Sequence, residues 1–502
     1  MNHGALAEPA DNKGILIIYT GGTIGCAKKD PNNSESPLNV VSWKRFIAEV
    51  PQLAEMGEKF RIKEHEITPP LDSTNMSPEN WKSIANIIGE NYTDFEGFVV
   101  LHGTDTMVYT ASALSFMLEN LNKPVILTGS QLPIIGYTRT DGVQNLVAAV
   151  EIANAKFFRH PIVPEVCILF NDVLLRGNRS RKRSASGFKA FESPNFPPLG
   201  TIGEHININP SLMLKRDPSK QLQINDQLEQ NVAAILLFPG IQESSVMHNI
   251  VKTEGLKGLV LLAYGTGNVP TSKKFLGAID TARKNKQVVL DVTQSNQGSV
   301  ELGVYETSAV LLERGVVSGS DITPEAALCK LMVLLGNEDY SIDEVMEEVQ
   351  TEMAGEQSRS VYSFTFSDEP AKLDFNEKRW RKPIKEVGSK WPSDQVEKVL
   401  LRLYGAHLET PNQAVGINLS CFIGIGSKDE LDPESRNFAG KFSRGSEDFS
   451  SMVILDITDS FRRLVSHNQA TSFTLALEND EEGYCLEWEK TELSIFTNSG
   501  AH

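Results

Sequence analysis

Short apolar runs alternate with amphipathic stretches from residue 14 to about residue 356. Several of these runs are continuously apolar and rich in β-branched residues, which is typical of parallel strands covered on both faces. The pattern predicts strands at residues 15–20, 98–103, 124–129, 166–171, 233–240, 258–265 and 288–294. Alternation of such strands with helices indicates an α/β architecture with a mostly parallel sheet.

Three of the amphipathic stretches repeat apolar residues at helical spacing. Asp141 and Thr323 stand where N-caps are expected, and Thr323 is followed by a proline and an acidic residue, as in the first turn of many helices. The apolar positions are Ala111, Leu114, Met117 or Leu118 and Leu121 in the first predicted helix, Val143, Leu146, Val147 and Val150 in the second, and Leu328, Leu331, Met332 and Leu335 in the third.

A polar, proline-containing segment at residues 215–230 interrupts this pattern. With 502 residues, the chain also exceeds the roughly 250–300 residues at which a single core stops growing. We therefore predict a large first α/β domain at residues 14–214, a linker at 215–230 and a smaller second α/β domain at 231–357. Both domains are expected to contain mostly parallel sheets.

The remaining residues, 358–502, show period-two alternation instead. Strand candidates are residues 415–423 and 452–457, the run with Phe473, Leu475 and Leu477, and the run with Leu486 and Trp488. This pattern predicts a β-rich domain, which we interpret as a small β-sandwich. A binding surface lined by Trp391 and Trp488 is one alternative, but isolated tryptophans are more often core residues. A structural or oligomeric role is the preferred hypothesis over a binding module.

Composition excludes several functions. The net charge of −17 argues against nucleic-acid binding. The five cysteines are odd in number, widely separated and free of C-x-x-C, so neither a disulfide framework nor a zinc site is expected. Neither a secretory leader nor a run of the ~20 apolar residues needed to span a membrane is seen. We therefore expect a cytoplasmic protein that has no metal, no cofactor and no contact with membranes.

Four segments place hydroxyls, glycines or charges after predicted strands, where open α/β sheets bind ligands. They are YTGGTIG with Gly22 and Thr23, LDSTNM with Ser73 and Thr74, LHGTDTM with Gly103, Thr104 and Asp105, and RGNRSRKR with Lys182. Each also has a simpler interpretation: a glycine turn, an ordinary loop, helix capping and a solvated basic face, respectively. No single segment decides between these interpretations.

Together with PVILTGSQLP, YGTGN and SGSDITPEAAL, these motifs resemble the bacterial-type L-asparaginases, specifically the cytoplasmic type I branch. The resemblance spans residues 14 to 356 and implies an asparaginase-like fold. It also implies an amidohydrolase that converts L-asparagine into L-aspartate and ammonia. The β-rich extension has no counterpart in the minimal type I enzymes.

The resemblance assigns roles by position. Thr23 corresponds to the nucleophile that forms an acyl-enzyme, and Thr104, Asp105 and Lys182 correspond to its catalytic partners. Ser73 corresponds to the serine that holds the substrate carboxylate, with Thr74 beside it, and Asp105 faces the substrate ammonium group. Gly22 and Gly103 are expected to line the substrate, and backbone N–H groups near Thr104 are expected to hold the oxyanion.

Two departures from the family pattern concern activation and regulation. The loop after the nucleophile, residues 26–40, lacks the tyrosine that the family usually places there. Some type I enzymes bind asparagine at a separate regulatory site through an arginine, a threonine and a cysteine, which match Leu262, Arg181 and Ser295 here. A leucine cannot replace a carboxylate-binding arginine. We therefore predict little or no activation by asparagine.

The resemblance further implies a homodimer or homotetramer. Three alternatives remain open: a glutaminase-asparaginase, an amidotransferase subunit and a non-catalytic scaffold. The amidotransferase relative carries its extra domain before the catalytic unit, whereas here the extension follows it. A non-catalytic scaffold is disfavoured because the threonines and Lys182 are all present.

Overall fold

The computed structural model describes residues 13–358, apart from 31, 34, 158–159, 216–218 and 303–305, and the backbone of the strands beyond residue 360. The chain divides into two compact units, Met1–Gln357 and Ser358–His502.

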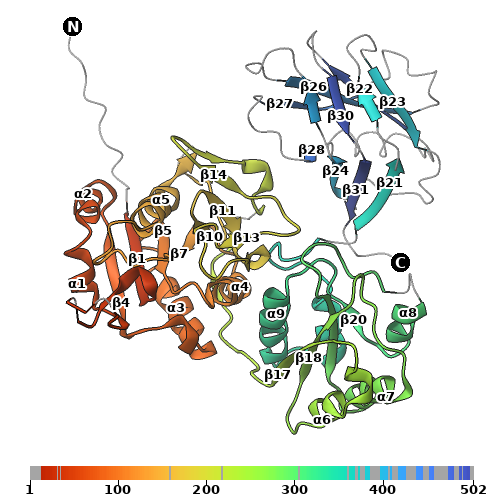
Figure 1. The fold of residues 1–502 in the computed structure, drawn as a ribbon, viewed down its shortest axis with the longest axis horizontal. Helices are drawn as coiled ribbons and strands as arrows, with labels where there is room; N and C mark the ends of the chain where they lie inside the picture. The colour runs from red at the N-terminus through yellow and green to blue at the C-terminus, as the bar shows by residue number, and fades with distance from the viewer. Residues whose placement is uncertain are drawn as a thin grey trace. The chain divides into compact units, whose positions relative to one another are not determined.

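The first unit begins with an eight-stranded sheet of order β15-β14-β11-β10-β7-β5-β1-β4 (Figure 1). Five neighbouring strands are parallel and three at one end are antiparallel. The parallel strands are β1 (Ile15–Gly21), β4 (Lys63–Leu71), β5 (Gly97–Leu101), β7 (Val125–Thr128) and β10 (Val166–Phe170), and the antiparallel ones are β11 (Val173–Arg176), β14 (Gly200–Ile202) and β15 (Ile206–Ile208).

Helices cover both faces of this sheet because its strands are apolar on both sides. Ile18 and Val100 pack with α3 (Pro78–Glu90) and α4 (Met107–Met117) on one face. Ile17 and Val99 pack on the other face with α1 (Trp43–Ile47), α2 (Pro51–Phe60) and α5 (Gly142–Asn154).

A second, four-stranded sheet follows, in which β17 (Val232–Leu236), β18 (Gly258–Ala263), β19 (Val288–Thr293) and β20 (Val317–Ser318) are all parallel. Helix α9 (Pro324–Gly336) packs against α4 of the large sheet, so one hydrophobic core continues through both parts (Figure 1). The other face carries α6 (Val246–Val251), α7 (Lys273–Lys284) and α8 (Glu306–Leu312), and α10 (Ile342–Glu348) follows α9.

Short pairs and 3-10 helices complete this unit. The pairs are β2 (Cys26–Lys28) with β3 (Leu38–Val40), β6 (Leu118–Glu119) with β16 (Gln223–Ile224), β8 (Lys156–Phe157) with β9 (His160–Pro161), and β12 (Arg181–Lys182) with β13 (Phe191–Glu192). The 3-10 helices are η1 (Thr23–Gly25), η2 (Ser73–Asn75), η3 (Gly177–Arg179), η4 (Pro210–Leu212) and η5 (Ile241–Glu243).

The α/β prediction is confirmed, and all seven predicted strands occur with shifts of a few residues at their ends. One predicted helix was too long: α4 ends at Met117, so Leu121 lies outside it. Leu118 instead pairs with Ile224, and Asn120 takes a positive φ of 59° that ends the helical path. Asp141 and Thr323 occupy the expected N-cap positions, but only Thr323 caps with its side chain, by accepting the Ala326 N–H.

The described strands of the second unit pair antiparallel in three sheets, which agrees with a β-rich domain. The sheets are β21 (Val361–Ser367), β31 (Lys490–Thr497), β24 (Val396–Tyr404) and β28 (Met452–Asp456); β22 (Ala371–Leu373), β30 (Cys485–Trp488) and β25 (His407–Glu409); and β23 (Arg379–Ile384), β29 (Phe473–Asn479), β26 (Ile417–Ile425) and β27 (Asn437–Arg444). Trp391 lies outside the described residues.

Within the described part of the chain, no helix combines the length and apolarity needed to cross a membrane. Cys26, Cys167 and Cys329 are buried free thiols.

Candidate active site

Three of the four predicted segments converge because their strands are neighbours. Strands β4, β1 and β5 lie side by side and run parallel, so their carboxyl ends share one edge of the large sheet (Figure 1). Thr23 follows β1, Ser73 follows β4, and Thr104 follows β5. Ligands of open α/β sheets bind at this edge.

Glycines allow the segments after β1 and β5 to touch. Gly22 has a positive φ of 83°, and a Cβ atom there would lie 2.3 Å from the backbone nitrogen of Gly103. Its own N–H donates to the carbonyl of Leu71 at 3.1 Å. Thr23 is half-buried and begins η1 directly after this contact. No larger residue fits at Gly22 without separating the two segments.

Ser73 lies on the other side of Gly103. A Cβ atom on Gly103 would lie 2.4 Å from the Ser73 Oγ, and the Ser73 side chain is buried. Thr106 Oγ1 donates to the Ser73 carbonyl at 2.7 Å, which fixes this turn against the start of α4. Thr74 is exposed, and its Oγ1 donates to Asp72 Oδ1 at 2.9 Å within the same turn.

Lys182 reaches the segment after β5 from a distant part of the chain. Its Nζ donates to Thr104 Oγ1 at 2.8 Å and to Asp105 Oδ1 at 2.7 Å. Helix capping does not explain these two residues, because the N-cap of α4 is Thr106, which makes no side-chain capping bond. Thr104 is buried, whereas Asp105 is largely exposed and therefore open to a ligand.

The basic run that contains Lys182 is not a solvated face, so that interpretation was wrong. Arg176 and Arg179 are buried and pair with Glu165 at 2.6 Å and with Asp321 at 2.8 Å. Arg181 pairs with Glu325 at 3.3 Å. Composition alone does not indicate these partners, because Asp321 and Glu325 lie 142 and 144 positions away and Glu165 precedes the neighbouring strand β10.

His102 is a supporting residue that sequence reasoning missed. Burial lowers the pKa of His102 to about 4, so its ring is neutral. Its Nδ1 lies 2.7 Å from the Gly103 carbonyl, which only accepts, so this nitrogen carries the proton. Its Nε2 accepts from Thr110 Oγ1 at 2.9 Å, and Trp81 donates to the same hydroxyl at 3.0 Å. This chain fixes the peptide that precedes Thr104.

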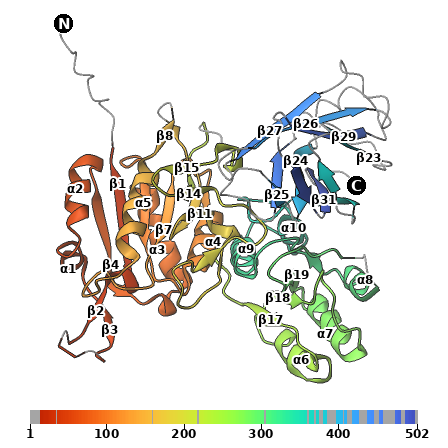
Figure 2. The same cartoon turned by 45° about the horizontal axis from the view of Figure 1, so that its top comes forward.

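Tyr19 anchors the loop that lacks the expected tyrosine. The loop forms the β2–β3 hairpin, which projects from the first unit in Figure 2. The hydroxyl of Tyr19 donates to the Val41 carbonyl at 2.8 Å, and Val41 N–H donates to the Gly25 carbonyl at 2.9 Å. Burial raises the pKa of Tyr19 well above its usual value. Tyr19 thus joins the two ends of the hairpin at Gly25, the last residue of the 3-10 helix that begins with Thr23.

The three positions that match the regulatory site do not form a site for a carboxylate. Arg181 is engaged with Glu325, and Leu262 packs against the shared hydrophobic core. Ser295 lies in an exposed loop, where its N–H donates to Thr293 Oγ1 at 3.0 Å.

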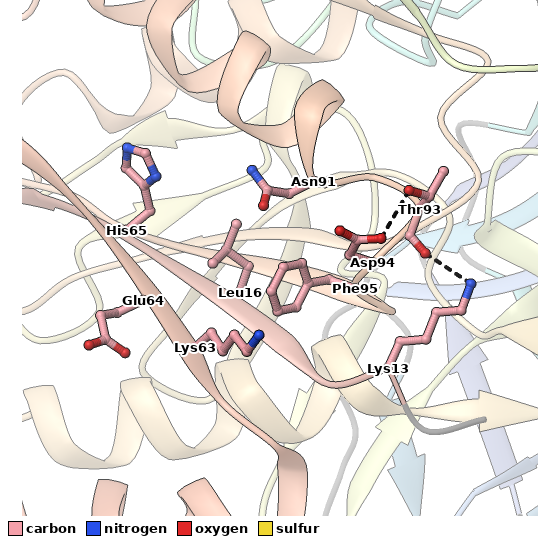
Figure 3. Close-up of a pocket in the computed structure, with 9 residues that line it drawn as sticks. All are labelled: Lys13, Leu16, Lys63, Glu64, His65, Asn91, Thr93, Asp94 and Phe95. Atoms are coloured by element: carbon pink, nitrogen blue, oxygen red, sulfur yellow. Dashed lines mark hydrogen bonds between the residues drawn. The ribbon is translucent and has the colours of Figure 1, made fainter. Parts of the chain in front are cut away.

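A separate hollow of about 510 Å³ lies near the opposite, amino ends of β1 and β4 (Figure 3). Leu16 and Phe95 form its apolar part, and Lys13 closes one side by donating to the Thr93 carbonyl at 2.9 Å. None of the predicted site residues lines this hollow.

The fold and the site define a class of α/β proteins with two mostly parallel sheets that carry hydroxyl, lysine and carboxylate groups beside the strand ends. Two family models match the chain: "Asparaginase, N-terminal" over residues 14–214 and "Glutaminase/Asparaginase C-terminal domain" over residues 231–347. The chain therefore belongs to the asparaginase family.

Individual relatives support this assignment. L-asparaginase 1 of Escherichia coli is 43% identical over 334 residues, which span 65% of this chain and 93% of that protein. The 60 kDa lysophospholipase of Mus musculus is 39% identical over 358 residues, 68% of this chain and 62% of that protein. The crystal structure of L-asparaginase I from Vibrio cholerae matches with a TM-score of 0.59 at 40% identity, covering 68% of this chain and 98% of that one.

Proposed function

We propose that this protein is an L-asparaginase that hydrolyses L-asparagine to L-aspartate and ammonia through Thr23. The observation that carries the proposal is the contact of Lys182 with both Thr104 and Asp105, beside the Gly22–Gly103 approach. This arrangement gathers a nucleophilic hydroxyl, a proton-transfer group and a ligand-facing carboxylate at one sheet edge. The similarity to L-asparaginase 1 of Escherichia coli supports the same activity.

The reaction takes place in two steps. Thr23 Oγ attacks the side-chain amide carbon and forms an ester, while its proton passes to the amide nitrogen, which leaves as ammonia. Water then hydrolyses the ester, returns the hydroxyl to Thr23 and releases aspartate. A threonine hydroxyl is a poor nucleophile at neutral pH, so a nearby group must accept its proton. Thr104 and Lys182 supply this path, and backbone N–H groups near Thr104 stabilise the oxyanion.

The substrate is held by the three strand ends. Ser73 binds its α-carboxylate with Thr74 beside it, and Asp105 binds its α-ammonium group. Asp105 is suited to this role because more than half of its side chain is exposed even while it contacts Lys182. Gly22 and Gly103 line the substrate, since neither has a side chain that would occupy the space.

The direct test is ammonia release from asparagine by the full chain and by Thr23→Ala. We expect the variant to lose at least ~10³-fold in kcat, because no other hydroxyl replaces the nucleophile. Thr201→Ala is the matched control, because Thr201 is exposed in β14, and it should keep the normal rate. Equal rates for Thr23→Ala and the unchanged protein would refute the assignment.

Glutamine is the alternative substrate that needs direct comparison, because the second family model bears the name of both activities. One extra methylene changes binding by only ~1–3 kcal/mol in a simple pocket, so cross-activity is expected. We propose asparagine as the better substrate, with the higher kcat/KM. A higher kcat/KM for glutamine would reverse the assignment without changing the mechanism.

We also propose a cytoplasmic homodimer or homotetramer. The support is an apolar surface on and after β17, where Leu236 and Phe238 are 53% and 48% exposed. Large exposed apolar side chains near one another are typical of interaction surfaces. The proposed domains are residues 14–214 and 231–357, joined by the linker at 215–230, and a β-rich domain at 358–502. Truncation after Ser358, followed by mass and activity measurements, tests whether the β-rich domain takes part in assembly.

A further inference from the structure

The last turn of the first unit, residues 353–357, packs against the 3-10 helix that leads to Lys182. We call this turn the clasp. Asn178 Nδ2 donates to the Ala354 carbonyl at 2.9 Å, and Arg179 Nε donates to the Gly355 carbonyl at 2.8 Å. Arg176 Nη1 also reaches the Gly355 carbonyl, at 3.4 Å. Two consecutive carbonyls of the clasp thus accept from three side chains of one basic segment.

The clasp is held rigidly from its other side. The Glu356 carboxylate accepts the N–H groups of Met353 at 3.1 Å and Ala354 at 2.8 Å, which closes the turn. Lys330 of α9 pairs with the same carboxylate at 2.6 Å, and both side chains are fully buried. Lys330 also donates to the Val349 carbonyl at 2.9 Å. The position of the clasp is therefore set by α9 of the second sheet.

Gly355 is the tightest point of the clasp. Its φ is +79°, and a Cβ atom there would lie 2.6 Å from Arg176 Nη1 and 2.9 Å from Leu214 Cδ2. The backbone approaches the two arginines this closely because no side chain intervenes. The ring of Phe196 supports both guanidinium groups, at 4.4 Å from Arg176 and 5.4 Å from Arg179.

Arg179 connects the basic segment to the second sheet at two points. Besides the clasp, its Nη1 pairs with Asp321 Oδ2 at 2.8 Å, just before α9 begins. Asn195 Nδ2 donates to the Asp321 carbonyl at 3.1 Å, so the same turn is also fixed through its backbone. Arg179 is buried, and its charge is paired rather than solvated. A buried, paired arginine of this kind holds its segment in one geometry.

Lys182 follows Arg179 by only three residues, so the geometry of the basic segment determines where its strand begins. Strand β12 contains only Arg181 and Lys182 and pairs with the two-residue strand β13, and Arg181 is also held by an ion pair to α9. The lysine side chain is flexible, and its Nζ must reach Thr104 and Asp105 together. A displacement of about 1 Å at a reacting group can cost ~10²-fold in rate.

We propose that Arg179 and the clasp position Lys182 for catalysis. This inference rests on the proposed asparaginase function. Arg179 is a positioning residue, since it lies outside the segments that hold the substrate. Loss of its contacts should lower kcat and leave KM nearly unchanged, because the substrate-binding groups follow β1, β4 and β5.

The test uses the full chain with Arg179→Gln combined with Asp321→Asn, so that no unpaired carboxylate is left buried. We expect kcat to fall about tenfold or more while KM stays within about twofold. Arg179→Lys, which keeps the charge and one donor, should recover part of the rate. Ile279→Val on the buried face of α7 is the control for destabilisation alone, and its kcat should not change.

The decisive measurement repeats the pair of substitutions in a Lys182→Ala background. If Arg179 acts through Lys182, the pair should then have little further effect on the residual kcat. An equal, additive loss in both backgrounds, or a rise in KM alone, would overturn the positioning role. Full activity of Lys182→Ala by itself would instead contradict the proposed function, so the two failures are distinguishable.

Discussion

Lys182 Nζ lies 2.8 Å from Thr104 Oγ1, although the two residues are 78 positions apart in the chain. Thr104 follows β5 of the large sheet, whereas Lys182 lies in the short strand β12, which follows β11 and η3. The same Nζ lies 2.7 Å from Asp105, so the lysine contacts both a buried hydroxyl and an exposed carboxylate. These contacts connect the residue that we propose for proton transfer with the carboxylate that we propose for substrate binding.

Removal of this ammonium group should therefore act mainly on the chemical step. We expect Lys182→Met to lower kcat by ~10²–10⁴-fold, the usual contribution of a positioned proton-transfer group. KM should change much less, because Ser73 and Asp105 remain. Steady-state ammonia release measures both constants. Lys189→Met is the control, since Lys189 lies in the same loop region but is 76% exposed; a similar loss there would show that the effect is not specific to the site.

The buried pair of Lys330 and Glu356 gives a prediction about stability. Lys330→Met leaves the Glu356 carboxylate fully buried without its cation, which should cost about 3–5 kcal/mol of unfolding free energy. Adding Glu356→Gln removes the unpaired charge and should recover part of the loss. Urea denaturation of the three proteins measures the difference.

The half-exposed pair of Lys257 and Glu229 is the comparison for this experiment. Lys257 is 54% exposed, so Lys257→Met should cost less than ~1 kcal/mol. If Lys330→Met were as mild as Lys257→Met, the clasp would not depend on the buried pair.

Local patterns predicted seven of the twelve strands in the two α/β sheets, because apolar runs such as residues 98–103 and 258–265 need no distant partner to be recognised. They placed Thr23 and Thr104 after predicted strands, but β4, which precedes Ser73, is mostly exposed and was not predicted. The parallel order of the sheet brings the three residues together. Family resemblance rather than pattern singled out Lys182 from its basic run.

What could not be predicted depends on residues far apart in the chain. The burial of Arg179 requires Asp321, 142 positions away, so the basic run looked solvated from its composition. Likewise, α4 stops at Met117 because Leu118 pairs with Ile224. The helical spacing that continues to Leu121 contains no information about that strand.

Asp291 should make stability depend on pH. It is buried in β19, and neither carboxylate oxygen has a hydrogen-bond partner within the described part of the chain. Burial raises the pKa of Asp291 to about 8, whereas an unfolded aspartate has a pKa of ~3.9. Between these values the folded state keeps a proton that the unfolded state has lost. The contribution of Asp291 to the unfolding free energy therefore falls as pH rises, by up to ~1.4 kcal/mol per pH unit.

Asp291→Asn removes this titration while keeping the shape of the protonated side chain. We expect the variant to match the unchanged protein near pH 4 and to be increasingly more stable than it as pH rises from 5 to 8. Urea unfolding at pH 4, 6 and 8 provides the comparison. Parallel stability curves for the two proteins would mean that Asp291 is not protonated in the folded state at neutral pH.

The dependence of rate on asparagine concentration tests the regulatory prediction. Leu262 packs against the shared core, and Arg181 is paired with Glu325, so neither offers a cation to a second asparagine carboxylate. We expect a hyperbolic rate curve with a Hill coefficient of about 1. Homotropic activation requires a second site that binds asparagine with different affinities in the less active and more active states. Ser295→Cys, which restores the sulfur of the matching family position, should leave the curve hyperbolic because the carboxylate-binding arginine is still missing. A strongly sigmoidal curve for the unchanged protein would show that asparagine activates the enzyme through other residues.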